Sequence, residues 1–479
     1  MTTPATKQPN IVFIMCDDHA AHAISAYGSR VNHTPHIDRI AKGGMRFDHC
    51  FCTNSICTPS RASIVTGTYN HINGCTTLAT HFDNKQPTYF HQLKKAGYAV
   101  GVFGKWHLGE GPEHEPKGVD TYCVLPGQGA YNNPHMIENG VKKRFSGYTT
   151  NIITDLSLDF MRRVEPGKPF AVMVHHKAPH REWEPEAKYL DYRKDEFIPL
   201  PSTFDDDYEG RPAAADAHMR IGRDLKPKDY KHEIPEGLTG RDLDVWKYQR
   251  YMHDYLACVQ SVDDGVGRIL DALDDMGIAD DTIVVYTSDQ GFYLGDHGWF
   301  DKRFMYEESL GMPFIVRYPR MVKPATVNED IVLNVDFAQT FCELAGAGDM
   351  PGHQGRSLVP LLQGQHPEDW RDCMYYRYWM HRDGAHNVWA HYGIRTDRYK
   401  LIYYYVDDCG QAGSKPNQGE KPYYELFDLH RDPCELRNVA EDPAYAAVRK
   451  DLTKRLRQEL LAVKDTPHPS EDAVAAAAG

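Results

Sequence analysis

The sequence lacks any apolar run that approaches the length of a membrane-spanning helix. Its mean hydropathy is −0.58, whereas a span needs about 20 consecutive apolar residues. The first ten residues contain no apolar segment of the kind that secretory signals carry, so we expect no signal peptide. These absences predict a cytoplasmic protein without a membrane partner.

Positive charge is also scarce. The chain has 54 Lys and Arg against 67 Asp and Glu, a formal net charge of −13. Nucleic-acid-binding proteins normally present a basic surface, so we exclude nucleic acid as a partner. Hydrophobic residues make up 41% of the chain, which excludes wholesale disorder. The 479 residues fit one large domain or two unequal ones.

The 11 cysteines lack the paired C-x2-C arms of common structural zinc sites. Their odd number and the expected reducing compartment favour free thiols over a disulfide framework. Cys50, Cys52 and Cys57 cluster as C-x-C-x4-C, and we consider a zinc site there but disfavour it because of this spacing. The thiols that lie in apolar stretches are predicted to be buried: Cys16, Cys258 and Cys342.

Short β-rich runs alternate with helical patterns along most of the chain. The predicted strands cover residues 10–16, 98–103, 170–175, 282–287 and 313–317. The predicted helices cover residues 35–42, 88–96, 154–164 and 247–276. This alternation predicts an α/β fold, in which helices sandwich a large, mixed and mostly parallel sheet.

The pattern changes at two places. Residues 182–244 are polar and rich in proline and charge, and we predict an ordered surface excursion near the mouth of the site. Beyond residue 365, aromatic runs resemble antiparallel strands and precede a helix over 443–463 that Asp442 would cap. We therefore expect a catalytic domain at 1–365 and a smaller α+β subdomain at 366–479, with an antiparallel sheet and a terminal helix.

Chemically active side chains follow four of the predicted strands, namely Asp17, Asp18, Lys105, His107, Lys177, His180, Asp289 and Gln290. Ligands of open α/β sheets bind beyond the carboxyl ends of the strands. The oxygen atoms of Asp17, Asp18, Asp289 and Gln290 favour a hard cation, calcium or magnesium, over zinc. An alternative left open is that Asp17 and Asp18 only cap the next helix.

The strongest local signal is the run from Cys57 to Arg61, Cys-Thr-Pro-Ser-Arg. Pro59 fits the first turn of a helix, which places Cys57 at a helix N-terminus, where backbone amides favour an anion. Arg61 lies one turn further along the same face, where its guanidinium can hold residue 57 and an anion together. The alternative is a buried cysteine beside a surface arginine.

These motifs together resemble the type I sulfatases of the alkaline-phosphatase superfamily. Cys57-x-Pro-Ser-Arg61, the block Gly-Lys-Trp-His-Leu-Gly over 104–109 and Thr-Ser-Asp-Gln-Gly over 287–291 occur in the order found in that family. Gln290 departs from the Asn or His of many members. Residues 295–309 resemble more narrowly the bacterial N-acetylglucosamine-6-sulfatases and mucin-desulfating sulfatases. The resemblance implies an alkaline-phosphatase-like fold and a sulfuric ester hydrolase.

The resemblance also implies a mechanism. A formylglycine-generating enzyme would oxidise Cys57 to formylglycine, whose hydrate attacks sulfur and later expels sulfate. The implied metal ligands are Asp17, Asp18, residue 57, Asp289 and Gln290, around Ca²⁺, with Mg²⁺ or Mn²⁺ as alternatives. Further implied catalytic groups are Arg61, Lys105 and Lys302 as cations, His180 as the acid, with Lys302 as helper or rival, and His107 as the base.

Substrate recognition is assigned to residues near the expected mouth. The candidates are Lys177, Trp183, His386, His391 and Arg395. The predicted substrate is a sulfated sugar or a similar small sulfate ester, which loses inorganic sulfate. Two alternatives stay open: a phosphonate monoester or phosphodiester hydrolase of the same superfamily, and a non-catalytic binding protein. The sequence also leaves homo-oligomerisation open.

Overall fold

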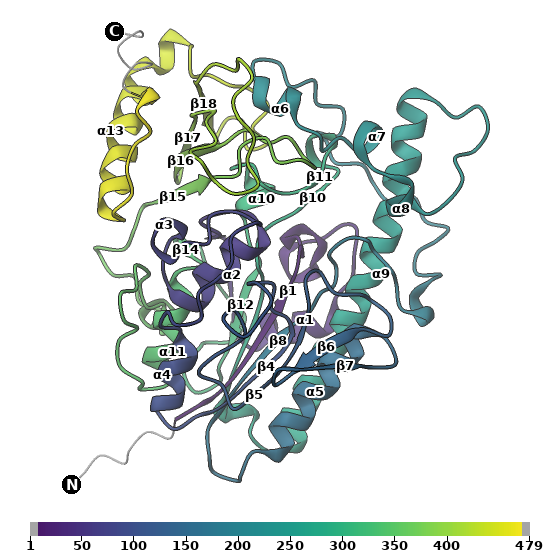
Figure 1. Ribbon diagram of the computed structural model, residues 1–479, viewed down its shortest axis with the longest axis vertical. Helices are drawn as coiled ribbons and strands as arrows, with labels where there is room; N and C mark the ends of the chain where they lie inside the picture. Colours follow the sequence, from purple (N-terminus) through teal and green to yellow (C-terminus); the bar gives the residue numbers. More distant parts are fainter. Residues whose placement is uncertain (1–7, 472–479) are drawn as a thin grey trace.

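The computed structural model describes residues 8–471, and its centre is a ten-stranded mixed sheet (Figure 1). Five adjacent strands, from β9 to β5, are parallel, as the sequence predicts. In sheet order the strands are β13 (Thr326–Asn328), β2 (Met45–Phe47), β12 (Phe314–Arg317), β9 (Thr282–Ser288), β1 (Asn10–Cys16), β8 (Phe170–His175), β4 (Ala99–Lys105), β5 (Thr121–Leu125), β6 (His135–Glu138) and β7 (Val141–Arg144).

Helices cover both faces of this sheet, and β1 shows why its sequence is apolar throughout. Ile11 and Phe13 belong to one hydrophobic core, whereas Val12 and Ile14 belong to a second one on the opposite face, because successive strand residues point to opposite sides. The first core contains residues of α2 (Cys57–Thr66), α4 (Tyr89–Lys95) and α11 (Asp336–Leu344). The second contains residues of α1 (Pro35–Lys42), α5 (Thr149–Arg163) and α9 (Gly240–Asp275).

A smaller antiparallel sheet follows, beyond the carboxyl ends of the central strands (Figure 1). Its strands, in order, are β15 (Cys373–Tyr378), β16 (His391–Thr396), β17 (Tyr399–Tyr404) and β18 (Tyr423–Asp428). Helix α13 (Ala446–Ala462) packs against it, after a 3-10 turn that Asp442 caps by accepting from the Ala444 N–H. The predicted sheet and terminal helix are confirmed, and the domain boundary at residue 365 stays a prediction.

Residues 182–244 are ordered, as predicted. They form short helices, α6 (Pro212–Asp216), α7 (Ile221–Asp224) and α8 (Pro227–Tyr230). The Asp216 carboxylate accepts hydrogen bonds from Asn387 (2.8 Å) and Trp389 (2.9 Å) of the small sheet's flank, and the His218 N–H donates to the His386 carbonyl (2.7 Å). This excursion therefore joins the two parts of the chain.

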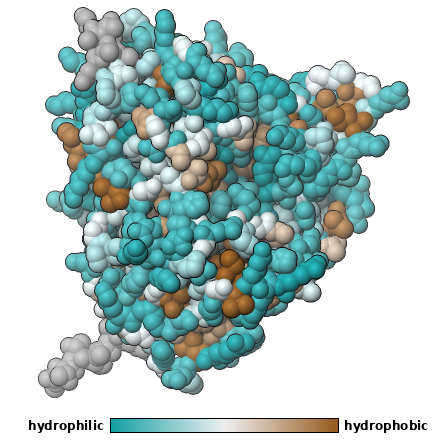
Figure 2. All heavy atoms as spheres, in the orientation of Figure 1, coloured by the Kyte–Doolittle hydropathy of each residue, from teal (hydrophilic) through white to brown (hydrophobic). Residues whose placement is uncertain are grey.

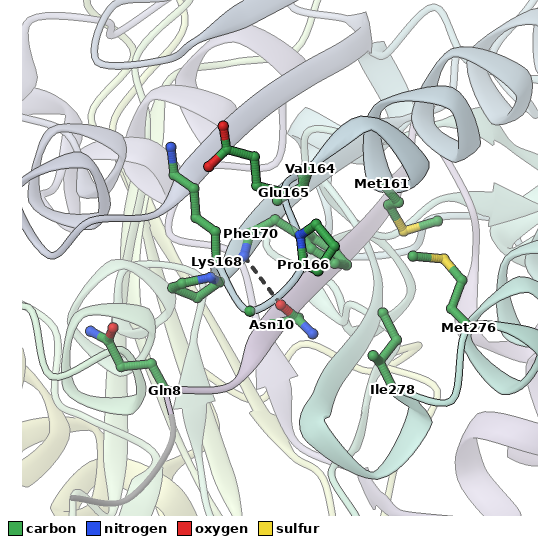
Figure 3. Close-up of a pocket in the computed structure, with 12 residues that line it drawn as sticks. Gln8, Asn10, Met161, Val164, Glu165, Pro166, Lys168, Phe170, Met276 and Ile278 are labelled. Carbon is green, nitrogen blue, oxygen red and sulfur yellow. Dashed lines mark hydrogen bonds between the residues drawn. The ribbon is translucent and has the colours of Figure 1, made fainter.

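A small pocket lies beside the amino ends of β1 and β8 (Figure 3). It has a volume of about 90 Å³ and is lined by residues that include Gln8, Lys168 and Met276. There the Asn10 side-chain oxygen accepts from the Phe170 N–H at 3.2 Å, at the amino ends of β1 and β8. Because α/β sheets bind ligands at the carboxyl ends of their strands, we assign this pocket no catalytic role.

The surface is mainly hydrophilic on the face that Figure 2 shows, with small, scattered apolar patches. Among residues 8–471, no helix combines the length and the apolar character that crossing a bilayer requires. Large apolar side chains such as Leu190 and Phe197 are exposed. Isolated apolar residues are normal on protein surfaces, so we assign them no function.

Gly104 offers a test of how closely β4 must approach β8. Its φ is +104°, and an added Cβ would lie 2.0 Å from the His175 carbonyl oxygen, so Gly104→Ala must separate the two strands. Gly97 also has a positive φ, +91°, but an added Cβ there meets no atom of residues 8–471 within 4 Å. We expect Gly97→Ala to lower the free energy of unfolding only by the cost of a left-handed backbone for a residue with a Cβ, about 1–2 kcal/mol. We expect Gly104→Ala to lower it clearly more. Urea unfolding midpoints measure both losses. Equal losses would contradict the close approach.

Candidate active site

Four adjacent parallel strands bring the predicted site residues to one edge of the sheet. Asp17 and Asp18 follow β1, and Asp289 and Gln290 follow its neighbour β9. Lys105 is the last residue of β4, and the loop after β8, between β1 and β4, carries the more distant candidates Lys177 and His180. Because parallel strands end at the same edge, residues far apart in the chain meet in one buried cluster.

Helix α2 supplies Cys57 and Arg61 to this cluster. Cys57 is the first residue of the helix, and its Sγ lies 3.5 Å from Asp17 Oδ1. Arg61 donates from Nε to Asp289 Oδ2 (2.8 Å) and from Nη1 to the Lys105 carbonyl (2.5 Å). Since Arg61 is only 2% exposed, the alternative of a surface arginine is wrong.

Lysines neutralise the remaining carboxylates. The Lys105 ammonium pairs with Asp17 Oδ2, and Lys302 Nζ donates to Asp18 Oδ1 at 2.5 Å. Both lysines are almost completely buried. Buried charges are tolerated only when they are paired and hydrogen-bonded, so these contacts explain why three carboxylates can share this edge.

The residues on either side of Lys302 are functional candidates that our sequence analysis missed. Asp301 and Arg303 have φ values of +81° and +100°. The Asp301 carboxylate accepts from the Lys302 N–H (2.9 Å) and lies 3.1 Å from His386 Nε2. The signal was present in the sequence, because three consecutive charged residues are flanked on both sides by aromatic and apolar residues. His386 thus lies against the loop that carries Lys302, and its contact with substrate stays a prediction.

Burial and neighbouring charges shift the pKa values of the three carboxylates in different directions. Burial raises the pKa of Asp18 to about 7, and burial together with Asp17 raises the pKa of Asp289 to about 6. Burial also opposes ionisation of Asp17, but Lys105 holds the pKa of Asp17 well below its usual value. A shared cation would relieve this repulsion.

The donor set fits a hard divalent cation. One oxygen from each of Asp17, Asp18 and Asp289 lies within 4.8 Å of the others. Gln290 donates its Nε2 to Asp18 (2.5 Å), whereas its buried Oε1 has no hydrogen-bond partner among the described residues. An all-oxygen set with a free amide oxygen is typical of calcium or magnesium sites.

The protonation states of Cys57 and two histidines follow from burial. Burial and the nearby Asp17 raise the pKa of the Cys57 thiol, so an unmodified Cys57 is a protonated and weak nucleophile. Burial and Lys105 lower the pKa of both His107 and His180 well below the usual range. His180 donates from Nδ1 to the Arg181 carbonyl (2.5 Å), which leaves Nε2 3.8 Å from Asp18.

Three of the five side chains predicted to contact the substrate are instead buried against other residues of the protein. Trp183 is fully buried against Tyr251, with ring centroids 4.5 Å apart, so the prediction that it stacks on a sugar is wrong. His391 is also wrong as a substrate contact, because it is fully buried in the aromatic core of the small sheet. Arg395 pairs with Glu307 at 3.2 Å and is 4% exposed, which makes it an internal ion pair.

Lys177 stays close to the cluster. Its Nζ donates to the Arg181 carbonyl (3.1 Å) and lies 4.8 Å from the Tyr131 ring centroid. Burial and the positive charge of Lys105 lower the pKa of Lys177 to about 8. A role in substrate binding therefore remains a prediction.

The cysteine predictions hold for the described residues. All 11 cysteines are free, and Cys16, Cys258 and Cys342 are buried. Within residues 8–471, no cluster of at least three potential metal-ligand residues includes Cys50 or Cys52. The zinc alternative at these two residues has no support.

Comparison with known proteins agrees with this geometry. Residues 9–347 match the family model described as Sulfatase, and residues 295–461 match the model described as N-sulphoglucosamine sulphohydrolase, C-terminal. The chain belongs to the sulfatase family. The predicted fold class and the prediction of an enzyme are thereby confirmed, and the alternative of a non-catalytic binding protein is set aside.

Several proteins similar to this sulfatase have names or titles that state an activity or a substrate. It is 39% identical to an N-acetylglucosamine-6-O-sulfatase of Bacteroides thetaiotaomicron, over 98% of this chain and 89% of the relative. A solved complex of a protein with its substrate D-glucosamine-2-N,6-O-disulfate superposes with a TM-score of 0.89, at 39% identity, over 96% and 98% of the two chains. A phosphonate monoester hydrolase from Silicibacter pomeroyi shares the fold, with a TM-score of 0.75, 23% identity and 96% coverage of both chains.

Arg61 offers a test of the site geometry. Lysine keeps the charge in Arg61→Lys, but it cannot contact both Asp289 and the Lys105 carbonyl, so we expect kcat for sulfate ester hydrolysis to fall by about 10²-fold. Arg46→Lys, at a surface pair with Asp48, is the matched control and should leave kcat within about twofold of the wild type. An Arg61→Lys enzyme with wild-type kcat would contradict the bridging role.

Proposed function

We propose that this sulfatase releases inorganic sulfate from the 6-O position of a glucosamine-type sugar. The observation that carries the proposal is the 39% identity to an N-acetylglucosamine-6-O-sulfatase over nearly the whole chain. The structural neighbour bound to a 6-O-sulfated glucosamine supports the same substrate class. A small sulfated sugar is therefore the proposed partner.

We infer that Cys57 acts after oxidation to formylglycine by a formylglycine-generating enzyme. The support is chemical, because the buried thiol has a raised pKa and cannot supply an anionic nucleophile near neutral pH. An aldehyde hydrate would supply a hydroxyl nucleophile at the start of α2. There the backbone amides and Arg61 favour an anionic group.

A calcium ion, or magnesium or manganese in its place, is the proposed cofactor. Asp17, Asp18, Asp289 and Gln290 would hold it together with an oxygen of residue 57. The ion supplies charge neutralisation and orientation of the sulfate ester. The support is the all-oxygen donor set, together with Gln290 Oε1, which has no hydrogen-bond partner in the described part of the chain.

The chain's own cations and imidazoles supply the remaining chemistry. Arg61, Lys105 and Lys302 surround the position where negative charge develops, which stabilises the transferring sulfate. His107 is neutral and fits a base. His180 is the proposed acid for the leaving oxygen, since a bound anion beside its Nε2 would favour its protonated form.

Phosphonate monoester hydrolysis is the second candidate. The observation that favours it is the structural neighbour with that activity, but at 23% identity this neighbour supports only the fold. The same arrangement of metal ion and nucleophile could act on a sulfate ester or on a phosphonate ester. We rank it second because the more similar relative is named for a sulfated sugar.

Glucosamine 6-sulfate tests the proposed substrate class. We expect natively produced enzyme to release sulfate from it with a kcat/KM at least about tenfold above that for an aryl phosphonate, a difference of about 1.4 kcal/mol in transition-state binding. Ion chromatography of released sulfate measures the reaction, and Cys57→Ala is the control without a nucleophile. A faster phosphonate reaction would overturn the choice.

Mass spectrometry tests the proposed modification in the same preparation. The peptide that contains residue 57 should be lighter by about 18 Da than its unmodified form, since the thiol becomes an aldehyde. A fully unmodified thiol in active enzyme would contradict the proposed nucleophile. The measurement is independent of which ester the enzyme prefers.

Removal of the cation provides a further test. Chelator-treated enzyme should lose activity and thermal stability, and calcium at 100 times its Kd should restore about 2.7 kcal/mol of stability. Asp289→Asn should abolish the calcium-dependent shift in Tm, whereas Asp48→Asn, on the surface, should retain it. A calcium shift that survives Asp289→Asn would place the ion elsewhere.

A further inference from the structure

A second group of potential metal ligands lies in the C-terminal part of the chain. Asp407 and Cys409 belong to the loop that follows β17, and His468 belongs to the segment after α13. One ligand atom of each residue lies within 4.8 Å of the other two. Unlike the carboxylate cluster of the active site, this group combines sulfur, nitrogen and oxygen.

The distance between the nitrogen and oxygen ligands suits a small tetrahedral ion. His468 Nε2 and Asp407 Oδ2 are 3.3 Å apart, and two ligands bound at about 2.0–2.1 Å in a tetrahedral zinc site are separated by about 3.3 Å. The Cys409 N–H donates to the other oxygen, Asp407 Oδ1, at 2.9 Å. This hydrogen bond turns Oδ2 toward the histidine and keeps Cys409 beside it.

The imidazole of His468 is held from its other side. Its ring stacks on Tyr405, with centroids 5.1 Å apart and an interplanar angle of 25°. Its Nδ1 lies 2.7 Å from Ser470 Oγ and 3.3 Å from the Ser470 backbone nitrogen. Ser470 Oγ is in turn hydrogen-bonded to the Tyr403 hydroxyl at 2.8 Å. These contacts hold the ring in place, and a metal at Nε2 would require the tautomer in which Nδ1 carries the proton and donates it to Ser470 Oγ, as metal-binding histidines typically do with the other ring nitrogen.

We propose that Asp407, Cys409 and His468 form a zinc site that is separate from the active site. Thiolate, imidazole and carboxylate are the ligands that zinc selects, whereas calcium prefers oxygen alone. Asp407 and Cys409 are exposed, so water can occupy the fourth position. Binding releases the thiol proton of Cys409, which passes to solvent as the sulfur–zinc bond forms.

The ion would fasten two distant parts of the chain to each other. The loop that carries Asp407 and Cys409 also reaches the catalytic part, where Gln411 Oε1 accepts from the Thr76 hydroxyl at 2.5 Å. The segment that carries His468 is joined to the small sheet by the hydrogen bond from its N–H to the Tyr392 hydroxyl (3.1 Å). Zinc would therefore act as a cross-link that stabilises the C-terminal segment.

Cobalt(II) titration of the calcium-loaded full-length protein tests the proposal, because a thiolate–cobalt bond gives a near-ultraviolet charge-transfer band. We expect one equivalent to produce this band and added zinc to remove it by displacing cobalt. Cys409→Ser should lose the band. Cys434→Ser changes a partly exposed cysteine outside the cluster, and Cys57→Ser changes the cysteine of the active site; both should keep it.

Zinc affinity provides the second measurement. Ser470→Ala leaves all three ligands in place but removes the partner of His468 Nδ1, and we expect zinc to bind about tenfold to a hundredfold more weakly. Circular dichroism of each variant shows whether it folds. The proposal is overturned if the wild type gives no thiolate band, or if the band persists in Cys409→Ser. A band lost only in Cys57→Ser assigns the metal to the active site and equally rejects the proposal.

Discussion

The electrostatic repulsion among three buried carboxylates is the constraint on which the catalytic edge of this sulfatase depends. Asp17, Asp18 and Asp289 follow neighbouring parallel strands, so the sheet itself forces them together. Such a group is stable only with compensating positive charge. The structure supplies that charge from three different elements, through Arg61, Lys105 and Lys302, and the oxygen atoms remain well suited to a divalent cation.

This arrangement connects the two parts of the chain. Arg61 comes from a helix on one face of the large sheet, and Lys105 comes from the sheet itself. Lys302 lies in a loop whose Asp301 carboxylate is 3.1 Å from His386, beside the small sheet. The small sheet is thus a support for a cation of the active site, and the excursion at residues 182–244 strengthens that connection through Asp216.

Prediction from sequence succeeded where local pattern and burial agree. The central strands β1, β8 and β9 lie within one residue of their predicted ends, because strands buried on both faces form continuous apolar runs. The sequence did not reveal the short outer strands β2, β6 and β7, whose three or four residues carry little pattern. Helices α5 and α9 begin five and seven residues before their predicted starts, at Thr149 and Gly240, since their first turns are polar.

The sequence by itself determined where the reactive residues lie relative to the strands and helices. It places a cysteine at a helix start, carboxylates after two strands, and cations after other strands. Those features depend on local periodicity and on the rule that strand ends share an edge. Only the tertiary structure decided that Trp183 and His391 are buried rather than available to a sugar, and that Asp407 lies 3.3 Å from His468. Burial and such contacts depend on partners that are distant in sequence, and these partners become neighbours only when the chain folds.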